Sequence, residues 1–486
     1  MINKRLIYKI IGSLLLLEAV FMLMCVVMSF FYKEHDLLPF IGATAITIAG
    51  GLGVKYLGRD ATNNMNRRDA YLVVTLTWLV FSVFGTLPYI FSGIITDPTD
   101  AFFETISGFT TTGASVINNV EDARLPHAIL FWRSLSQWVG GLGIVFFTIA
   151  VLPSMVGGSV KVFSAEATGP IRAKMHPRLS TNAKWIWTVY LVLTVACCLA
   201  FFFGGMDWFS SINYAMTTTA TGGFSIHNDS IAHFHSPLIE YTGILFQFMA
   251  GVNFTVIYMS IFKGKIKSLL HNSEVRFYCL MVLIATVWIG YLLMTRNGYS
   301  IEQALRSSLF QVVSLMTTTG IFSDNVGAWP HLTWIILSLL MFIGACAGST
   351  SGGFKSIRAL MIFRVIQNEL LRILHPKAVL PVKINGQSVP HGQINNLLAF
   401  LGIYIIAITG IAALMASIGL DSANSMVISL SCISNVGLPL NVIGPDFTWS
   451  ALPVLIKWIC SVLMLMGRLE IFSVIVLFTR AFWKDN

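Results

Sequence analysis

The chain has 486 residues, of which 55% are hydrophobic and only 11% are charged, and its formal net charge is +9. A soluble domain carries about 25% charged residues, so a soluble fold of this size could not cover its surface. The composition excludes a large soluble protein and predicts an all-α polytopic membrane protein.

Positive charge is concentrated in alternate loops. Lys and Arg cluster in the N-terminal arm, in the C-terminal tail, and in the segments 55–68, 161–184, 263–276 and 355–383, whereas acidic residues prevail in the intervening loops. Because positive charge is retained in the cytoplasm, we expect the basic loops and both termini to be cytoplasmic. A basic loop between apolar spans does not require a nucleic-acid partner, and we expect none.

In chain order, two apolar spans come first, at 6–31 and 37–57. The first is too long for a signal peptide, so we interpret it as a retained helix. Four units of span, short segment and span follow, at 71–95, 99–112 and 126–153; 184–204, 207–221 and 237–262; 277–295, 301–319 and 331–368; and 394–418, 421–436 and 449–481.

Crossing a bilayer takes about 20 helical residues, so the short segments must enter and return on one side. The sequence therefore predicts about ten transmembrane helices and four re-entrant pore helices with fourfold pseudo-symmetry around one pore. The chain divides into a two-helix unit at 1–69 and pore repeats at 70–156, 157–263, 264–376 and 377–486.

Each short segment begins with a helix-capping residue, namely Asp97, Asp207, Ser300 or Asp421. Each ends in a triplet whose last residue is glycine, and the triplets lie about 100 residues apart: Thr111-Thr112-Gly113, Ala220-Thr221-Gly222, Thr318-Thr319-Gly320 and Asn435-Val436-Gly437. Four such strands around one axis can form a ring of backbone carbonyls for a dehydrated cation. We expect the ligands to be the carbonyls of the first two residues of each triplet, on the acidic outer side, where negative charge would concentrate cations.

The motifs around these triplets carry a resemblance to a known family. They are TTTGAS (110–115), TATGGFS (219–225), TTTGIFS (317–323), SNVGLPL (434–440), GACAGSTSGGFK (344–355) and MGRLE (466–470). Over its whole length the chain resembles the Trk/Ktr/HKT superfamily of potassium transporters, most closely the bacterial Trk branch.

The resemblance implies K⁺ uptake across the bacterial inner membrane, with K⁺ as the transported ion and no organic cofactor. It also implies a lipid-embedded homodimer with a pore in each protomer, gated by a cytosolic nucleotide-binding ring protein of the RCK type. Glycine at all four filter positions goes with K⁺ in this family, whereas serine at the first goes with Na⁺. Coupling to protons or sodium, as in a symporter, stays open.

The long span 331–368 is interrupted by four glycines, Gly344, Gly348, Gly352 and Gly353, followed by Lys355. Glycine disfavours a continuous helix. The stretch resembles the family's intramembrane gating loop. A phosphate-binding loop is excluded because Phe354 breaks the required spacing; a glycine-rich helix-packing patch remains the alternative.

Arg468 lies in an apolar run, and a charge at membrane depth usually faces a cavity or a partner. The resemblance implies that it acts with the loop as an electrostatic barrier below the filter. The alternative is a structural ion pair with an acid such as Glu104. We interpret Arg133 and Lys457 as snorkelling side chains.

Two further features have local, structural interpretations. Arg306 is a candidate brace for a filter strand. His227, His233 and His235 are interpreted as an exposed polar loop in preference to a metal site.

Two other functional classes fit the sequence less well. A secondary transporter of sodium or of a small organic solute uses inverted repeats, whereas these four units share one orientation. An enzyme is not expected, because the sequence shows no paired carboxylates, metal cluster or nucleophile–base set.

Overall fold

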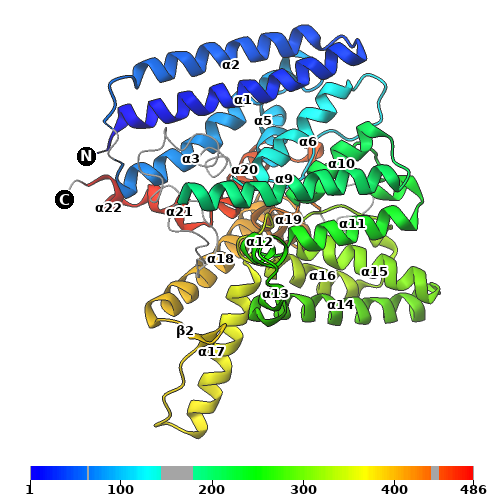
Figure 1. Cartoon of the computed structure of the whole chain (residues 1–486), viewed down its shortest axis with the longest axis vertical. Helices are drawn as coiled ribbons and strands as arrows, with labels where there is room; N and C mark the ends of the chain where they lie inside the picture. Colours follow the sequence, from blue (N-terminus) through cyan, green and yellow to red (C-terminus); the bar gives the residue numbers. More distant parts are fainter. Residues whose placement is uncertain (1, 63–64, 144–178, 439–447, 485–486) are drawn as a thin grey trace.

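The computed structural model describes residues 2–62, 65–143, 179–438 and 448–484 (Figure 1). Within these ranges the fold is helical apart from one short hairpin of β1 (Lys383–Ile384) and β2 (Gln387–Ser388). The all-α expectation is confirmed. The predicted end of the span 126–153, most of the basic loop 161–184 and the 156/157 repeat boundary lie outside the described residues.

Six single or nearly continuous helices in the described ranges are long and apolar enough to cross a membrane. They are α1 (Lys4–Tyr32), α2 (Leu37–Leu57), α3 (Arg67–Phe84) continued by α4 (Leu87–Phe91), α9 (Leu179–Phe203), α14 (Ser273–Asn297) and α18 (His391–Ser417). Helices α1 and α2 pack against each other along one side of the molecule (Figure 1). Both termini lie at the same end of the molecule (Figure 1).

The four short segments form the pore helices α5 (Pro98–Phe109), α10 (Trp208–Ala220), α15 (Ile301–Met316) and α19 (Ser422–Ser434). Each begins at the predicted cap, whose side chain accepts a backbone N–H: Asp97 from Thr99, Asp207 from Ser210, Ser300 from Gln303, and Asp421 from Ala423 and Asn424. At 1.5 Å per residue, even the longest would reach about 24 Å, short of a bilayer's roughly 30 Å core. We call the face at which these helices begin the pore-helix face.

The second span is broken in units two, three and four, whereas the sequence predicted a break only for the third; in unit one the structure describes this span only as far as Gly143. Helix α6 (His127–Gly141) ends at a glycine pair. Helix α11 (Pro237–Ala250) meets α12 (Phe254–Ile261) at 104°, and α20 (Val454–Arg468) meets the segment α21–η4 (Phe472–Phe478) at 111°. In the third unit, the non-helical residues 344–355 separate α16 (His331–Ile343) from α17 (Ser356–Leu374). The continuous spans expected at 237–262 and 449–481 are therefore corrected to bent pairs.

Close backbone packing explains where two of these helices, α6 and α20, end. A Cβ atom on Gly140 would overlap the carbonyl oxygen of Phe109 at the end of α5, and one on Gly467 would overlap that of Ile433 near the end of α19. Only glycine lets the second helix approach the pore helix this closely. The remaining elements are short: η1 (Ser230–Phe234), α13 (Ile266–His271), η2 (Val326–Ala328), η3 (Trp449–Ala451), η4 (Val476–Phe478) and α22 (Arg480–Trp483).

Candidate functional site: a carbonyl ring above a glycine-rich loop

The non-helical segments that follow the four pore helices share one backbone conformation. We call them the filter strands, after the role that the sequence predicts for them. In each, a non-glycine residue with positive φ is followed two positions later by a glycine with positive φ. The pairs are Thr111 (53°) and Gly113 (81°), Thr221 (53°) and Gly223 (84°), Thr318 (59°) and Gly320 (77°), and Asn435 (56°) and Gly437 (69°).

Backbone hydrogen bonds fix the same register. The residue between each pair donates its N–H to the carbonyl five residues earlier, inside the pore helix. The four bonds are Thr112 to Ser107 (2.9 Å), Gly222 to Thr217 (2.9 Å), Thr319 to Ser314 (2.7 Å) and Val436 to Ser431 (3.0 Å).

The four glycines form a closed ring. A Cβ atom on each would overlap the carbonyl oxygen that precedes the glycine of the next unit: Gly113 against Gly222, Gly223 against Thr319, Gly320 against Val436, and Gly437 against Thr112. The fourth contact returns to the first unit, so the order around the ring follows the chain. The sequence's fourfold arrangement is therefore present in the backbone itself.

In the second unit the register differs by one residue from that expected. The ring glycine is Gly223, and Gly222 occupies the position of Thr112. Two adjacent glycines follow Thr221, so the motif fits either alignment, and the end of α10 together with the contact of Gly223 with Thr319 decides between them. Ala220 is the last residue of α10, so the carbonyls equivalent to those of Thr111 and Thr112 belong to Thr221 and Gly222.

We call the four carbonyls that contact the ring glycines the ring carbonyls, and most of them accept no hydrogen bond from the described part of the chain. Among the described residues, the carbonyls of Thr112, Thr319 and Val436 accept no hydrogen bond. That of Gly222 accepts one from Gln137 Nε2 (2.7 Å), and Gln137 Oε1 accepts the N–H of Phe224 (3.1 Å). A buried carbonyl normally has a partner, so these oxygens suit a cation that has lost its water shell.

A buried ion pair supports the first two filter strands from behind. Arg133 Nε lies 2.8 Å from Glu104 Oε1, and the two side chains are 2% and 0% exposed. Glu104 also accepts hydrogen bonds from Ser115 Oγ (3.0 Å) and the Val116 N–H (2.8 Å), while Arg133 donates to the carbonyl of Ser225 (2.9 Å). Arg133 is therefore a structural residue, and its interpretation as a snorkelling side chain is wrong.

Two further ion pairs join neighbouring units. Lys457 Nζ on α20 lies 2.5 Å from Asp100 on α5 and is buried, so it does not snorkel either. Arg306 on α15 lies 2.6 Å from Glu240 on α11 and 2.9 Å from Glu302. Arg306 pairs with these two acids, so the suggested brace for a filter strand is corrected to a link between units two and three.

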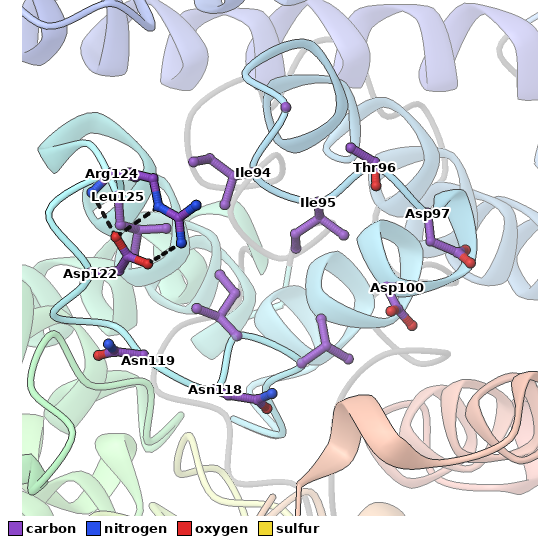
Figure 2. Close-up of a pocket in the computed structure, with 13 residues that line it drawn as sticks. Ile94, Ile95, Thr96, Asp97, Asp100, Asn118, Asn119, Asp122, Arg124 and Leu125 are labelled. Atoms are coloured by element: carbon purple, nitrogen blue, oxygen red, sulfur yellow. Dashed lines mark hydrogen bonds and ion pairs between the residues drawn. The ribbon is translucent and has the colours of Figure 1, made fainter.

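A pocket of about 450 Å³ lies on the pore-helix face beside the first filter strand (Figure 2). Its acids are mostly paired: Asp100 with Lys457, and Asp122 with Arg124 at 2.7 Å. The hydrogen bond from Arg124 lowers the pKa of Asp122 to about 2, so this carboxylate is ionised at physiological pH. The side chains of Lys457 and Arg124 neutralise these two carboxylates. This part of the pore-helix face therefore attracts cations from solution less strongly than its number of acidic residues suggests.

The loop of residues 344–355, which we call the glycine loop, packs under the ring. Cys346 N–H donates to the carbonyl of Gly251 (3.0 Å), Thr350 Oγ1 to that of Thr219 at the end of α10 (3.0 Å), and Gly352 N–H to Thr318 Oγ1 (2.6 Å). A Cβ on Gly352 would overlap the Ser434 carbonyl at the end of α19. The loop thus touches the pore-helix ends or filter strands of units two, three and four.

Three of the expected gating glycines take positive φ, Gly344 (71°), Gly348 (74°) and Gly353 (73°). Lys355, whose φ is also positive, closes the turn by donating from Nζ to the carbonyl of Ser351. The glycines therefore serve a folded loop, and the alternative of a helix-packing patch does not describe them.

Arg468 connects this loop to the first unit. It donates to the carbonyls of Thr350 (2.8 Å), Gly140 (2.6 Å) and Gly141 (2.5 Å). The alternative pairing with Glu104 is contradicted, because Glu104 binds Arg133. The nearby Glu470 pairs with Arg358 at 2.5 Å.

Four capped half-helices that end at one closed carbonyl ring, with a glycine-rich loop beneath it, define a polytopic membrane protein built from pseudo-repeats. Residues 39–485 match the family model TrkH, described as a cation transport protein. The chain is 35% identical to the Trk system potassium uptake protein TrkH of Halomonas elongata and 36% identical to that of Escherichia coli, over 99% of each chain. The crystal structure of the potassium transporter TrkH from Vibrio parahaemolyticus superposes with a TM-score of 0.89 at 32% identity, covering 99% of both chains.

The chain belongs to the TrkH family. This is a family of transporters and not of enzymes, so the expectation that the chain is not an enzyme is confirmed.

Proposed function

We propose that this protein takes up K⁺ across the bacterial inner membrane through the carbonyl ring. The observation that carries the proposal is the closed contact order of Gly113, Gly223, Gly320 and Gly437. The carbonyls of Thr111, Thr112, Thr221, Gly222, Thr318, Thr319, Asn435 and Val436 would replace the hydration shell of the ion. The carboxyl ends of four pore helices face the ring, and their dipoles favour a cation over an anion.

Two observations favour K⁺ over the alternatives of sodium or an organic solute. All four ring positions are glycine, and the relatives are named potassium uptake proteins. An organic solute would need side-chain donors in a cavity, whereas this ring presents backbone oxygens.

Growth at low external potassium tests the proposal. Expression in bacteria that lack their own K⁺ uptake systems is expected to restore growth in micromolar K⁺. Uptake of ⁸⁶Rb⁺, measured against ²²Na⁺ in the same cells, identifies the ion. Equal growth with and without the gene, or uptake of ²²Na⁺ alone, would reject K⁺ as the substrate.

We further propose that the glycine loop and Arg468 form a gate below the ring. The loop contacts units two, three and four, and Arg468 ties it to unit one through the carbonyls of Gly140 and Gly141. A fixed positive charge on the path opposes a cation, and movement of the loop would have to break these hydrogen bonds.

Replacing Arg468 with glutamine is expected to raise ion flux. At an effective dielectric constant of about 20, a unit positive charge within about 12 Å of a cation opposes it by about 1.4 kcal/mol or more, so flux should rise roughly tenfold. The measurement is ⁸⁶Rb⁺ uptake into proteoliposomes per molecule of reconstituted protein, with Arg124→Gln on the exposed loop as the control. Lower protein yield with unchanged flux per molecule would instead assign Arg468 a purely structural role.

The proposal extends to the subunits and the partner with which this protein assembles. The relatives belong to what is named a Trk system, which supports a second component, and we propose a homodimer in lipid that docks a cytosolic nucleotide-binding ring protein of the RCK type. Both termini lie at one end of the molecule, which supports a common cytoplasmic location. Helix α17 and the β1–β2 hairpin project from the body of the molecule (Figure 1) and offer a docking surface.

A further inference from the structure

Two loops from different pore units meet on the pore-helix face. Glu121 follows the first filter strand, and His227 and His233 follow the second. The Nδ1 atom of His227 lies 2.8 Å from Glu121 Oε1, and that of His233 lies 3.6 Å from the same oxygen. One nitrogen or oxygen atom from each of the three side chains falls within 4.8 Å of the others.

We propose that these three side chains bind one divalent transition-metal ion of the zinc class. Two imidazoles and one carboxylate are a common zinc ligand set, with bonds of about 2.0–2.2 Å. Ligand atoms around a tetrahedral ion of that size lie about 3.3 Å apart, and the two distances to Glu121 Oε1 bracket this value. The three side chains are 39%, 20% and 43% exposed in the order Glu121, His227 and His233, which leaves room for water as a fourth ligand.

The carboxylate is held in place from its other side. Asn228 Nδ2 donates to Glu121 Oε2 (3.0 Å) and to Asn119 Oδ1 (2.8 Å), and Asn228 Oδ1 accepts the N–H of Val120 (2.9 Å). This leaves Glu121 Oε1 facing both histidines. Such outer hydrogen bonds orient ligands and strengthen metal binding.

The two imidazole rings must turn before they can share one ion. They stack with centroids 3.7 Å apart and planes 4° from parallel, whereas the lone pair of a ligand nitrogen lies in its ring plane, so the rings must tilt to share one ion. His233, the more exposed of the two, is the ring free to turn. His227 is fixed at its backbone, because its N–H donates to Ser225 Oγ (3.0 Å) and its carbonyl accepts from the same hydroxyl (2.7 Å).

The site would join units one and two close to the filter. Ser225, which holds His227, lies two residues after Gly223, and its carbonyl accepts the hydrogen bond from the buried Arg133. An ion shared by Glu121 and the histidines would therefore cross-link the two loops that continue from the first and second filter strands.

Zinc titration of the purified full-length protein, with its affinity tag removed, tests the proposal. Calorimetry with ZnCl₂ is expected to show one saturable ion per chain at micromolar concentration, and the melting temperature should rise with zinc. The double substitution His227→Ala and His233→Ala should weaken binding at least tenfold. Mg²⁺ should not compete, because it prefers oxygen ligands.

The matched control is His235→Ala, which removes a histidine from the same loop but outside the cluster and should leave zinc affinity unchanged. Glu121→Gln should weaken binding without removing a histidine. X-ray absorption of the zinc-loaded protein should show two imidazole ligands. Equal zinc affinity in the wild type and the double variant, or no saturable binding to the wild type, would overturn the proposal whatever ion the pore conducts.

Discussion

Replacing Gly223 with serine is expected to lower the preference for K⁺ over Na⁺ by roughly tenfold or more. Gly223 has a φ of 84°, and a side chain there would overlap the carbonyl oxygen of Thr319 in the next unit. The left-handed backbone alone costs a non-glycine residue about 1–2 kcal/mol, and about 1.4 kcal/mol corresponds to a tenfold change in an equilibrium. The strand can relieve the overlap only by opening the ring. The measurement is ⁸⁶Rb⁺ uptake in competition with K⁺ and with Na⁺.

The matched variant is Gly222→Ser, one residue earlier. Gly222 does not have positive φ, and its added side chain would meet the amide of Gln137, which can move, instead of backbone. Its loss of selectivity should be clearly smaller. Gly113→Ser should behave like Gly223→Ser, because its side chain would overlap the Gly222 carbonyl. Wild-type selectivity in Gly113→Ser and Gly223→Ser would reject the ring, and a larger effect at Gly222 would restore the register expected from sequence.

The pore helices could be located from sequence because their signals are local. A capping side chain, a helix too short to cross and a terminal glycine all lie within 20 residues of one another in each unit, and Asp97, Asp207, Ser300 and Asp421 cap the helices as predicted. No such local signal determines the register of the filter strand in unit two. Thr221 is followed by two glycines, and the contact of Gly223 with Thr319, almost 100 residues away in the chain, is what selects between them.

The positions at which the helices of the second spans end depend on backbone contacts with other segments, and the sequence alone does not show which segments those are. Gly140 and Gly467 resemble ordinary helix-packing glycines until the backbones of Phe109 and Ile433 are placed against them. Leucine-rich, apolar segments such as 449–481 are long enough for a straight crossing, so length alone could not indicate the bend after Arg468.

The buried charges were missed for the same reason. Lys457 and Asp100 are 357 positions apart, and each alone looks like a polar residue near the end of a span. Only the closure of unit four against unit one brings them together. Charged residues in the apolar segments of this protein thus serve two purposes: Arg133 and Lys457 hold units together around the filter, whereas Arg468 binds the loop beneath it.

Replacing Glu104 with glutamine is expected to destabilise the protein by about 3–5 kcal/mol, because it leaves the buried guanidinium of Arg133 without a counter-charge. Glu104 is 0% exposed and Arg133 is 2% exposed, and between them they hold Ser115, Val116 and the carbonyl of Ser225. The expected results are a strongly lowered melting temperature in detergent and a loss of the monodisperse elution peak.

The exposed pair provides the control for this prediction. Asp122→Asn removes the partner of Arg124, whose side chain is 87% exposed, and should leave the melting temperature unchanged, because exposed ion pairs contribute little. The double substitution Glu104→Leu and Arg133→Met removes both buried charges and should recover much of the lost stability, although the hydrogen bond to Ser225 is not replaced. A wild-type melting temperature in Glu104→Gln, or a double variant less stable than the single one, would show that this ion pair does not hold the first two filter strands.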